Sequence, residues 1–180
     1  MKKTEHTARN PALCTPHSAL TIVALGSNLG DSRRIILEAT MRLQDFSDRT
    51  ILKSSLWQTS PVDCPSGSPP FINAVVGLIP RNDETPETLL NKLQSLEQEF
   101  GRQPKQIPNE PRPLDLDLIA FGHATRNTQH IRLPHPRAYL RRFVLEPLNE
   151  IAPDLVLAGQ GKAVAQLLAE LSSTEILERL

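Results

Sequence analysis

The amino-acid sequence predicts an α+β fold, a ferredoxin-like antiparallel sheet packed by helices, with additional elements at the C-terminal end. Apolar periodicity gives the element order strand, helix, strand, strand, helix, strand, which is that of a split β-α-β fold. The chain has 180 residues and no visible internal repeat, which suits one domain with a sizeable core. We therefore expect one folded domain over residues 19–180, after a disordered extension, residues 1–18, that is polar and aperiodic.

The first predicted strand, residues 20–25, is a β-branched run that ends at Gly26. A loop with two glycines follows, and Asp31 or Ser32 can cap a helix that apolar spacing predicts over residues 32–46. Such a strand-to-helix turn can bind phosphate at the helix N-terminus, or it can be only a tight turn. Because the loop lacks the spacings of the known phosphate-binding loops, we interpret it as mainly structural.

Two further strands are predicted on either side of a loop rich in proline and glycine. Residues 50–58 alternate in polarity and predict the second strand. Residues 71–79 predict the third, and its alternation puts Phe71, Asn73 and Val75 on one face. Asn73 can cap a turn or satisfy a backbone group, or it can read a polar heterocycle with its amide donor and acceptor.

The second predicted helix begins with Thr85 as a possible N-cap and Pro86 at the first helical position. It ends before Gly101. Gln94 and Glu97 lie three residues apart and hence on neighbouring positions of one face. The simplest interpretation of that face is that it is solvated.

A proline-rich loop and an acidic strand follow this helix. Residues 102–112 contain three prolines and three cations, and a loop of this length is typical of a functional lid. Residues 111–122 predict a buried strand in which Asp115 and Asp117 share one face while leucines occupy the other. Two neighbouring anions on a half-buried face need a cation, and carboxylate oxygens suit Mg²⁺ or Mn²⁺. The alternative is that both point into water or pair with Arg112 and a neighbour; within this apolar run we favour the metal.

The C-terminal third is less regular. We expect a hairpin or loop that carries His123 and His130, then a short apolar segment up to Leu148. Apolar spacing predicts a last helix over residues 163–171.

Composition argues against several classes of protein. The 20 basic and 20 acidic residues give no overall positive field of the kind that nucleic-acid binding needs. Cys14 and Cys64 have no metal-ligand spacing and form no secreted disulfide framework, so the reducing cytosol is expected. No run is long enough to span a membrane, and the start lacks the apolar core of a signal peptide. We expect a cytoplasmic monomer with small-molecule substrates and neither nucleic-acid nor membrane partners.

Four cationic side chains flank the acidic pair in the sequence: Arg102, Arg112, His135 and Arg141. Any single arginine is more often a surface cation or an ion-pair partner. Arginines beside a metal are what phosphoryl transfer requires, because neutralisation of phosphate charge supplies much of that catalysis. Their recurrence around one acidic pair therefore favours phosphoryl transfer.

Six stretches resemble, in the same order, the motifs of 6-hydroxymethyl-7,8-dihydropterin pyrophosphokinase. They are residues 24–31, 59–62, 71–74, 97–102, 111–122 and 133–147, within a match over roughly residues 20–160. The resemblance implies a single pyrophosphokinase domain that acts in folate biosynthesis (EC 2.7.6.3). It implies transfer of the terminal diphosphate of ATP to the hydroxymethyl oxygen of the pterin, release of AMP, and two Mg²⁺ ions.

Carried over position by position, the resemblance implies roles for individual residues. The catalytic set would be Arg102, Arg112, Asp115 and Asp117, with both aspartates as metal ligands. The ATP site would comprise Gln94, Glu97, Arg102, Arg112, Leu118, His135 and Arg141. The pterin site would comprise Thr59, Ser60, Val62, Phe71, Asn73, Asp115 and Phe143, with the two aromatics on either side of the flat ring. No side chain is an obvious base for the hydroxymethyl proton: Asp115, Asp117 and a metal-bound hydroxide all remain open.

The chain also departs from the family pattern in the lid. Pro104, Pro108, Asn109 and Glu110 stand where further basic residues and often a Trp are usual, so lid closure is expected to differ.

Two rival functions remain. A nucleotidyl or glycosyl transferase also uses Asp-x-Asp on a metal-nucleotide, but it would release pyrophosphate or a nucleoside diphosphate. A ferredoxin-like RNA-binding module is disfavoured by the neutral net charge and by the lack of an aromatic strand motif.

Overall fold

The computed structural model describes residues 20–61, 64–104 and 110–180. The extension predicted over residues 1–18, the predicted site residue Val62 and the middle of the predicted lid therefore lie outside the described residues. In the described part, no helix is both long and apolar enough to cross a membrane.

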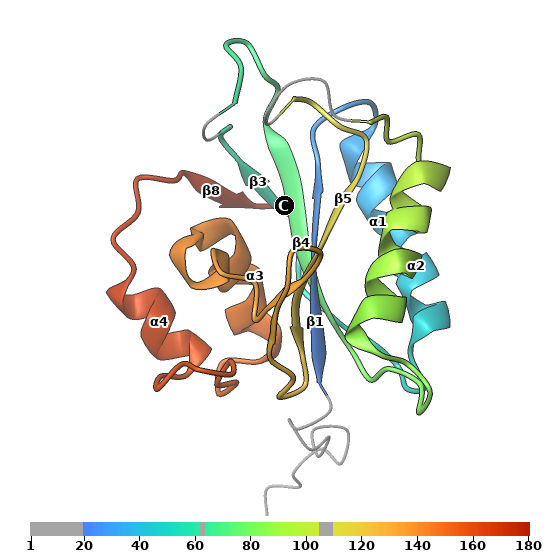
Figure 1. Ribbon diagram of the computed structural model, residues 1–180. Helices are drawn as coiled ribbons and strands as arrows, with labels where there is room; N and C mark the ends of the chain where they lie inside the picture. The colour runs from blue at the N-terminus through green and yellow to red at the C-terminus, as the bar shows by residue number, and fades with distance from the viewer. Residues whose placement is uncertain (1–19, 62–63, 105–109) are drawn as a thin grey trace, which may run out of the picture.

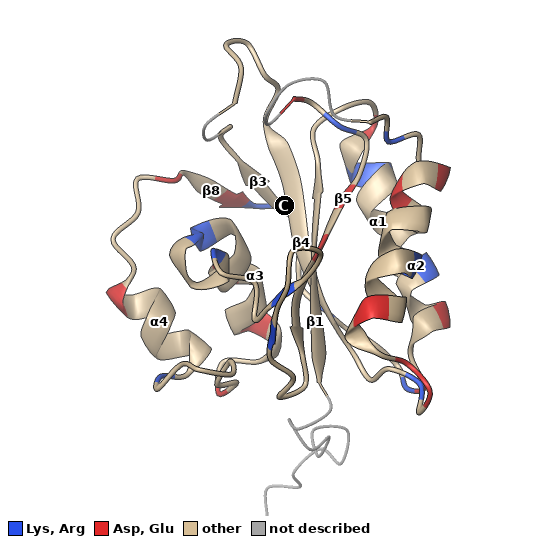
Figure 2. Cartoon of the chain, viewed as in Figure 1, with Lys and Arg blue, Asp and Glu red and all other residues tan. Residues whose placement is uncertain are grey.

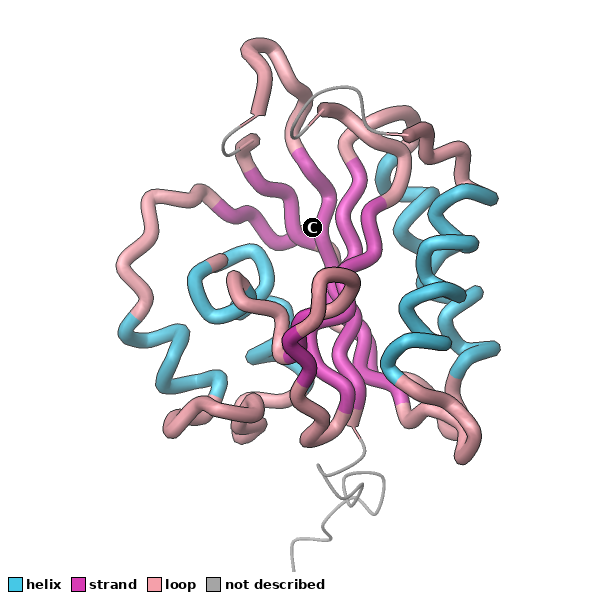
Figure 3. Tube along the Cα trace, viewed as in Figure 1, coloured by secondary structure: helices cyan, strands magenta, loops and turns pink. Residues whose placement is uncertain are grey.

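A central antiparallel sheet with helices on both faces forms the molecule (Figures 1 and 3). The strands run in the order β5-β1-β4-β3-β8, and β2 also pairs with β4. They are β1 (Thr21–Ser27), β2 (Leu52–Lys53), β3 (Trp57–Thr59), β4 (Phe71–Leu78), β5 (Asp115–Phe121) and β8 (Leu177–Arg179). A separate two-stranded ladder joins β6 (Arg126–Asn127) to β7 (Arg132–Leu133), so of the two expected alternatives, a hairpin or a loop, the hairpin forms.

Within the described residues, four α-helices cover the sheet, two on each face. Figure 1 shows α1 (Ser32–Leu43) and α2 (Pro86–Glu99) on one face, and α3 (Arg142–Ile151) and α4 (Val164–Glu170) on the other. Short 3₁₀ turns follow α1 at Gln44–Phe46 and precede α3 at Ala138–Leu140. Lys and Arg are interspersed with Asp and Glu over these helices and loops (Figure 2).

Each face of the sheet has its own apolar core. Because side chains alternate along a strand, Val23 and Leu25 of β1 lie in the core under α1 and α2, whereas Ile22 lies in the core under α3 and α4. The same alternation on β5 buries Leu116 and Leu118 against α1 and α2. The predicted split of the acidic strand into a leucine face and an aspartate face is therefore confirmed.

Both predicted helices of the first half form with the expected caps. The Asp31 carboxylate accepts a hydrogen bond from the Arg34 amide at 3.1 Å at the start of α1. Thr85 caps α2, and Pro86 is its first residue. The backbone after α2 turns at Gly101, whose φ of 87° is a left-handed conformation that favours glycine.

The continuous strand predicted over residues 50–58 is wrong. β2 and β3 both pair with β4, but Lys53 lies opposite Val76 and Trp57 opposite Asn73, so four steps on one side meet three on the other. Ser54 satisfies the backbone of Val75 between the two strands. Its amide donates to the Val75 carbonyl at 3.0 Å, and its hydroxyl accepts from the Val75 amide at 2.9 Å. One extra residue is thus accommodated as a bulge between the two short strands.

The C-terminal elements differ most from the sequence-based expectation. The segment up to Leu148, predicted only as apolar, is helix α3, which continues through the buried Pro147. The terminal strand β8 was not predicted, and it pairs antiparallel with β3. The predicted last helix is confirmed as α4.

Candidate active site

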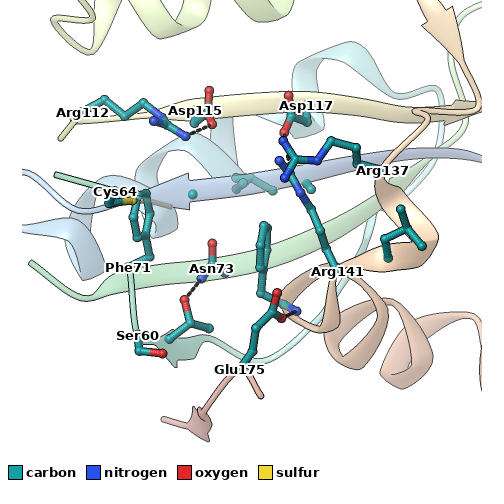
Figure 4. A pocket seen from close by; sticks show the side chains of 16 residues that line it. Ser60, Cys64, Phe71, Asn73, Arg112, Asp115, Asp117, Arg137, Arg141 and Glu175 are labelled. Carbon is teal, nitrogen blue, oxygen red and sulfur yellow. Dashed lines mark hydrogen bonds and ion pairs between the residues drawn. The ribbon is translucent and has the colours of Figure 1, made fainter. Parts of the chain in front are cut away.

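A cavity of about 280 Å³ lies on the α3 side of the sheet, where β1, β3, β4 and β5 meet the segment before α3. Nine predicted site residues line it: Thr59, Ser60, Phe71, Asn73, Arg112, Asp115, Asp117, Arg141 and Phe143. Figure 4 shows the two aspartates projecting from one strand toward this space, with Asn73 across from them. Sheet pairing thus gathers side chains that are far apart in the sequence.

Asp115 is held by two arginines. Arg112 Nη2 donates to Oδ2 at 2.6 Å, and Arg102 Nη1 donates to Oδ1. Burial opposes the charge of this carboxylate, but Arg112 and Arg102 outweigh it and hold the pKa of Asp115 below its usual value. The predicted alternative, pairing with Arg112 and a neighbour, therefore describes how Asp115 is held in this structure.

Asp117 is less completely neutralised. The guanidinium nitrogen Nη1 of Arg141 lies 3.9 Å from Asp117 Oδ2. Burial and the adjacent charge of Asp115 raise the pKa of Asp117, and the cations around it only partly offset them. A further cation at this carboxylate would therefore be stabilising.

The carboxylate pair suits a magnesium ion that a substrate also holds. Among the described residues, no group of three or more His, Cys, Asp or Glu side chains is placed to hold a metal ion. Mg²⁺ is commonly bound by one or two carboxylates while phosphates and waters complete its octahedral shell. Asp115 and Asp117 on one strand face provide that donor set.

Glu97 supports Arg102 from the outer edge of the sheet. Its Oε1 accepts from the Leu116 amide of edge strand β5 at 2.6 Å, and it also accepts from Arg102 Nη1. The residue is only 8% exposed, and burial raises the pKa of Glu97 to about 7 despite these partners. The alternative of a solvated helix face is wrong for Glu97, whereas Gln94 on the same helix is exposed.

The glycine-containing loop after β1 fixes Arg112. Buried Asn28 accepts from the Arg112 amide at 2.9 Å through its side chain and donates to the Arg112 carbonyl at 3.2 Å through its own amide. Gly26 lines the cavity, and a Cβ there would lie 3.2 Å from Asn73 Oδ1. This loop therefore positions site residues, in keeping with the structural role predicted for it.

The aromatic end of the cavity combines rings, arginines and one buried amide. The Arg112 guanidinium lies 5.5 Å from the Phe71 ring centre, and that of Arg141 lies 5.3 Å from the ring of Phe143. Asn73 Nδ2 donates to the Thr59 hydroxyl at 2.8 Å, so Asn73 neither caps a turn nor satisfies the backbone with this group. That hydrogen bond fixes the orientation of the amide at the floor of the cavity.

Among the predicted residues that the structure describes, five are not part of the cavity lining: Gln94, Glu97, Arg102, Leu118 and His135. Leu118 is buried in the core under α1 and α2. The His135 ring nitrogen Nδ1 accepts from the Arg137 amide at 3.3 Å, and burial lowers the pKa of His135. The ATP-binding roles of Gln94, Glu97, Leu118 and His135 stay predictions.

Seven lining residues were missed by the sequence-based site prediction: Ala24, Leu25, Gly26, Cys64, Arg137, Leu140 and Glu175. Arg137 and Leu140 lie within a stretch already singled out, so their proximity to His135 and Arg141 was a usable signal. Glu175 gave no such signal, because it follows the last helix and reaches the cavity only through strand β8.

Comparison with known proteins places the chain in a family. A family model described as 7,8-dihydro-6-hydroxymethylpterin-pyrophosphokinase (HPPK) matches residues 22–153. A Pseudomonas aeruginosa protein named 2-amino-4-hydroxy-6-hydroxymethyldihydropteridine pyrophosphokinase is 38% identical over 150 residues, which cover 82% of this chain and 88% of that protein. The "Folic acid synthesis protein fol1" of Pneumocystis carinii is 34% identical over 154 residues, but the chain spans only 20% of its length.

The fold also matches solved structures. The Plasmodium falciparum HPPK-DHPS wild type with pteroate superposes with a TM-score of 0.65 over 84% of this chain and 42% of that one, at 14% identity. At this identity the match bears on the fold, and the predicted ferredoxin-like α+β class is confirmed. With its family model matched over residues 22–153, the chain belongs to the 7,8-dihydro-6-hydroxymethylpterin-pyrophosphokinase family.

Proposed function

We propose that this chain transfers the terminal diphosphate of ATP to the hydroxymethyl oxygen of 6-hydroxymethyl-7,8-dihydropterin and releases AMP, as a step of folate biosynthesis. Family membership supports this activity, as does the name of the Pseudomonas aeruginosa relative, of which the chain covers 88%. The observation that carries the proposal is the meeting of the two aspartates, Arg112, Arg141 and two aromatic rings around one cavity.

The carboxylate end of the cavity binds the polyphosphate. Asp115 and Asp117 would hold Mg²⁺, two ions by the family resemblance, and the bound metal would neutralise phosphate charge. Arg112 has unused capacity to bind an anion, because its buried Nε makes no hydrogen bond within the described residues. An unpaired buried donor is costly, so a phosphate oxygen that accepted from it would be stabilised. Arg102, held between Glu97 and Asp115, adds a second positive charge beside the metal ligands.

The aromatic end binds the pterin. Phe71 and Phe143 provide two flat apolar surfaces, and a ring stacked between them is held by dispersion and burial. Asn73 presents its amide at the cavity floor with its donor end already oriented by Thr59. The amide can then recognise the polar edge of the heterocycle.

Asp117 is the better placed carboxylate to accept the hydroxymethyl proton. Both oxygens of Asp115 accept hydrogen bonds from arginines, whereas the ion pair of Asp117 with Arg141 is longer, at 3.9 Å. An oxygen not used on the metal can take the proton.

The experiment measures AMP formation from Mg²⁺, ATP and hydroxymethyldihydropterin by the wild type, Asp115→Ala, Asp117→Ala and the control Asp83→Ala. Asp83 lies in an exposed turn, so its variant is expected to keep the wild-type rate. Each site variant should lose turnover by at least about a thousandfold while its circular dichroism remains native. A wild-type rate in either site variant would remove that residue from the metal role.

We also propose a monomer in the cytoplasm, which light scattering of the pure protein and fractionation of cells would test.

A further inference from the structure

We propose that Glu175 is a positioning residue for the pterin end of the cavity, because its carboxylate caps helix α3 and so fixes Phe143. This inference rests on the proposed function, since it assigns the ring of Phe143 to pterin binding. Figure 4 places Glu175 at the end of the cavity opposite Asp115 and Asp117.

Helix α3 has no cap from its own neighbourhood. It begins at Arg142, and the side chain of its N-cap residue, Arg141, makes no capping hydrogen bond. The first turn contains no acidic residue. The first N–H groups of a helix lack partners within the helix and need acceptors from elsewhere. Glu175 supplies one, since its Oε2 accepts from the Phe143 amide at 3.1 Å across 32 residues of sequence.

The charge of Glu175 also suits this place. A carboxylate near a helix N-terminus interacts favourably with the helix dipole. Arg141, the N-cap residue, extends from this end of the cavity toward Asp117 in Figure 4. Glu175 thus binds the first turn of α3, next to which Arg141 and Phe143 both line the cavity.

Strand β8 delivers Glu175 to this point. The Ser60 amide donates to the Ile176 carbonyl at 3.4 Å, and the Leu180 amide donates to the Leu56 carbonyl at 2.9 Å. Arg179 adds contacts from the strand, with Nε 2.9 Å from the Ser55 hydroxyl and 3.3 Å from Glu150 Oε1. The last residues of the chain therefore attach Glu175 beside β3, the strand that supplies Thr59 to the cavity.

A positioning role has a kinetic signature. Without the cap, the first turn of α3 and the ring of Phe143 lose their fixed position, so pterin binding weakens while the reacting groups on β5 remain in place. Loss of a helix cap corresponds to about a tenfold weakening. We expect the KM for the pterin to rise about tenfold in Glu175→Ala, with kcat at saturating pterin within about twofold of the wild type.

The test compares Glu175→Ala, Glu175→Gln and Glu178→Ala in the full chain, by initial rates of AMP formation at varied pterin. Glu175→Gln keeps an acceptor oxygen and should restore a KM within about threefold of the wild type. Glu178 lies on β8 and is exposed, so its variant controls for general effects on the strand. If Glu175→Ala does not fold, Glu175→Asp, one methylene too short to reach the Phe143 amide, should show the same rise in KM.

Several results would overturn the inference. The inference fails if Glu175→Ala keeps the wild-type KM for the pterin. If only Glu175→Asp folds, a wild-type KM in that variant has the same meaning. Equal losses in Glu175→Ala and Glu175→Gln, or a fall in kcat with KM unchanged, would also overturn it. Failure of the proposed function itself is distinguishable, because then the wild type would form no pterin diphosphate.

Discussion

The buried carboxyl of Glu97 should make stability depend on pH in a way that is measurable without substrates. Burial raises the pKa of Glu97 from its ordinary value of 4.5 to about 7. The folded protein therefore holds this proton more tightly than the unfolded chain does. The resulting contribution to stability is complete below about pH 4.5 and is lost as the pH rises to about 7.

The size of this effect follows from the two pKa values. The gap between 4.5 and about 7 corresponds to a loss of about 3 kcal/mol in the free energy of unfolding across that range. Between pH 5 and pH 8, most of that loss, about 2 kcal/mol or more, should be visible. Glu97→Gln removes the titration but keeps an acceptor for the Leu116 amide, so it should lose this part of the pH dependence.

The assay is urea unfolding of the metal-free wild type and Glu97→Gln at pH 5 and pH 8. The matched control is Glu99→Gln on the same helix, where the carboxylate is 53% exposed and pairs with Arg42 at 2.8 Å. An exposed ion pair contributes little, so this control should follow the wild type at both pH values. The reasoning fails if Glu97→Gln also runs parallel to the wild type from pH 5 to pH 8.

Two substitutions test the shape of the pterin end. Because one stacking surface is lost, Phe71→Ala should raise the KM for the pterin about tenfold or more while the KM for ATP changes little. An unchanged pterin affinity, measured by calorimetry, would argue against stacking. Gly26→Ala places a methyl group 3.2 Å from Asn73 Oδ1 in the cavity floor. The pterin KM should therefore rise at least about fivefold. The melting temperature should stay within a few degrees of the wild type. Gly161→Ala is its control, because a Cβ there meets nothing within 4 Å. Equal kinetics in the two variants would contradict the assignment of this cavity floor to pterin binding.

Much of the fold could be predicted from local signals. The alternation around Asp115 and Asp117 predicted the two faces of β5, and the Thr85-Pro86 pair predicted the start of α2. Helix α3 was missed because Pro147, a residue that ordinarily ends a helix, lies inside it. The bulge at Ser54 was missed because it depends on the register against β4, which no local pattern in residues 50–58 contains.

The site was predictable where one segment carries several of its residues. The Asp-x-Asp strand and the flanking arginines lie close in sequence, and the structure brings Arg102, Arg112 and Asp115 into direct contact. Glu97 was predicted at the site, but its burial depends on how α2 packs against the edge of β5. The position of Glu175 at the cavity depends on the pairing of β3 with the three-residue strand β8, and sequence periodicity does not indicate that pairing.

The fate of the two outer phosphoryl groups of ATP tests the central claim most directly. Phosphorus NMR of a complete reaction with Mg²⁺, ATP and hydroxymethyldihydropterin should show AMP and, in equal amount, a pterin product with two mutually coupled phosphorus resonances. ADP with a singly phosphorylated pterin, or free pyrophosphate with a nucleotide-bearing product, would contradict the claim that this cavity directs attack at the β-phosphorus.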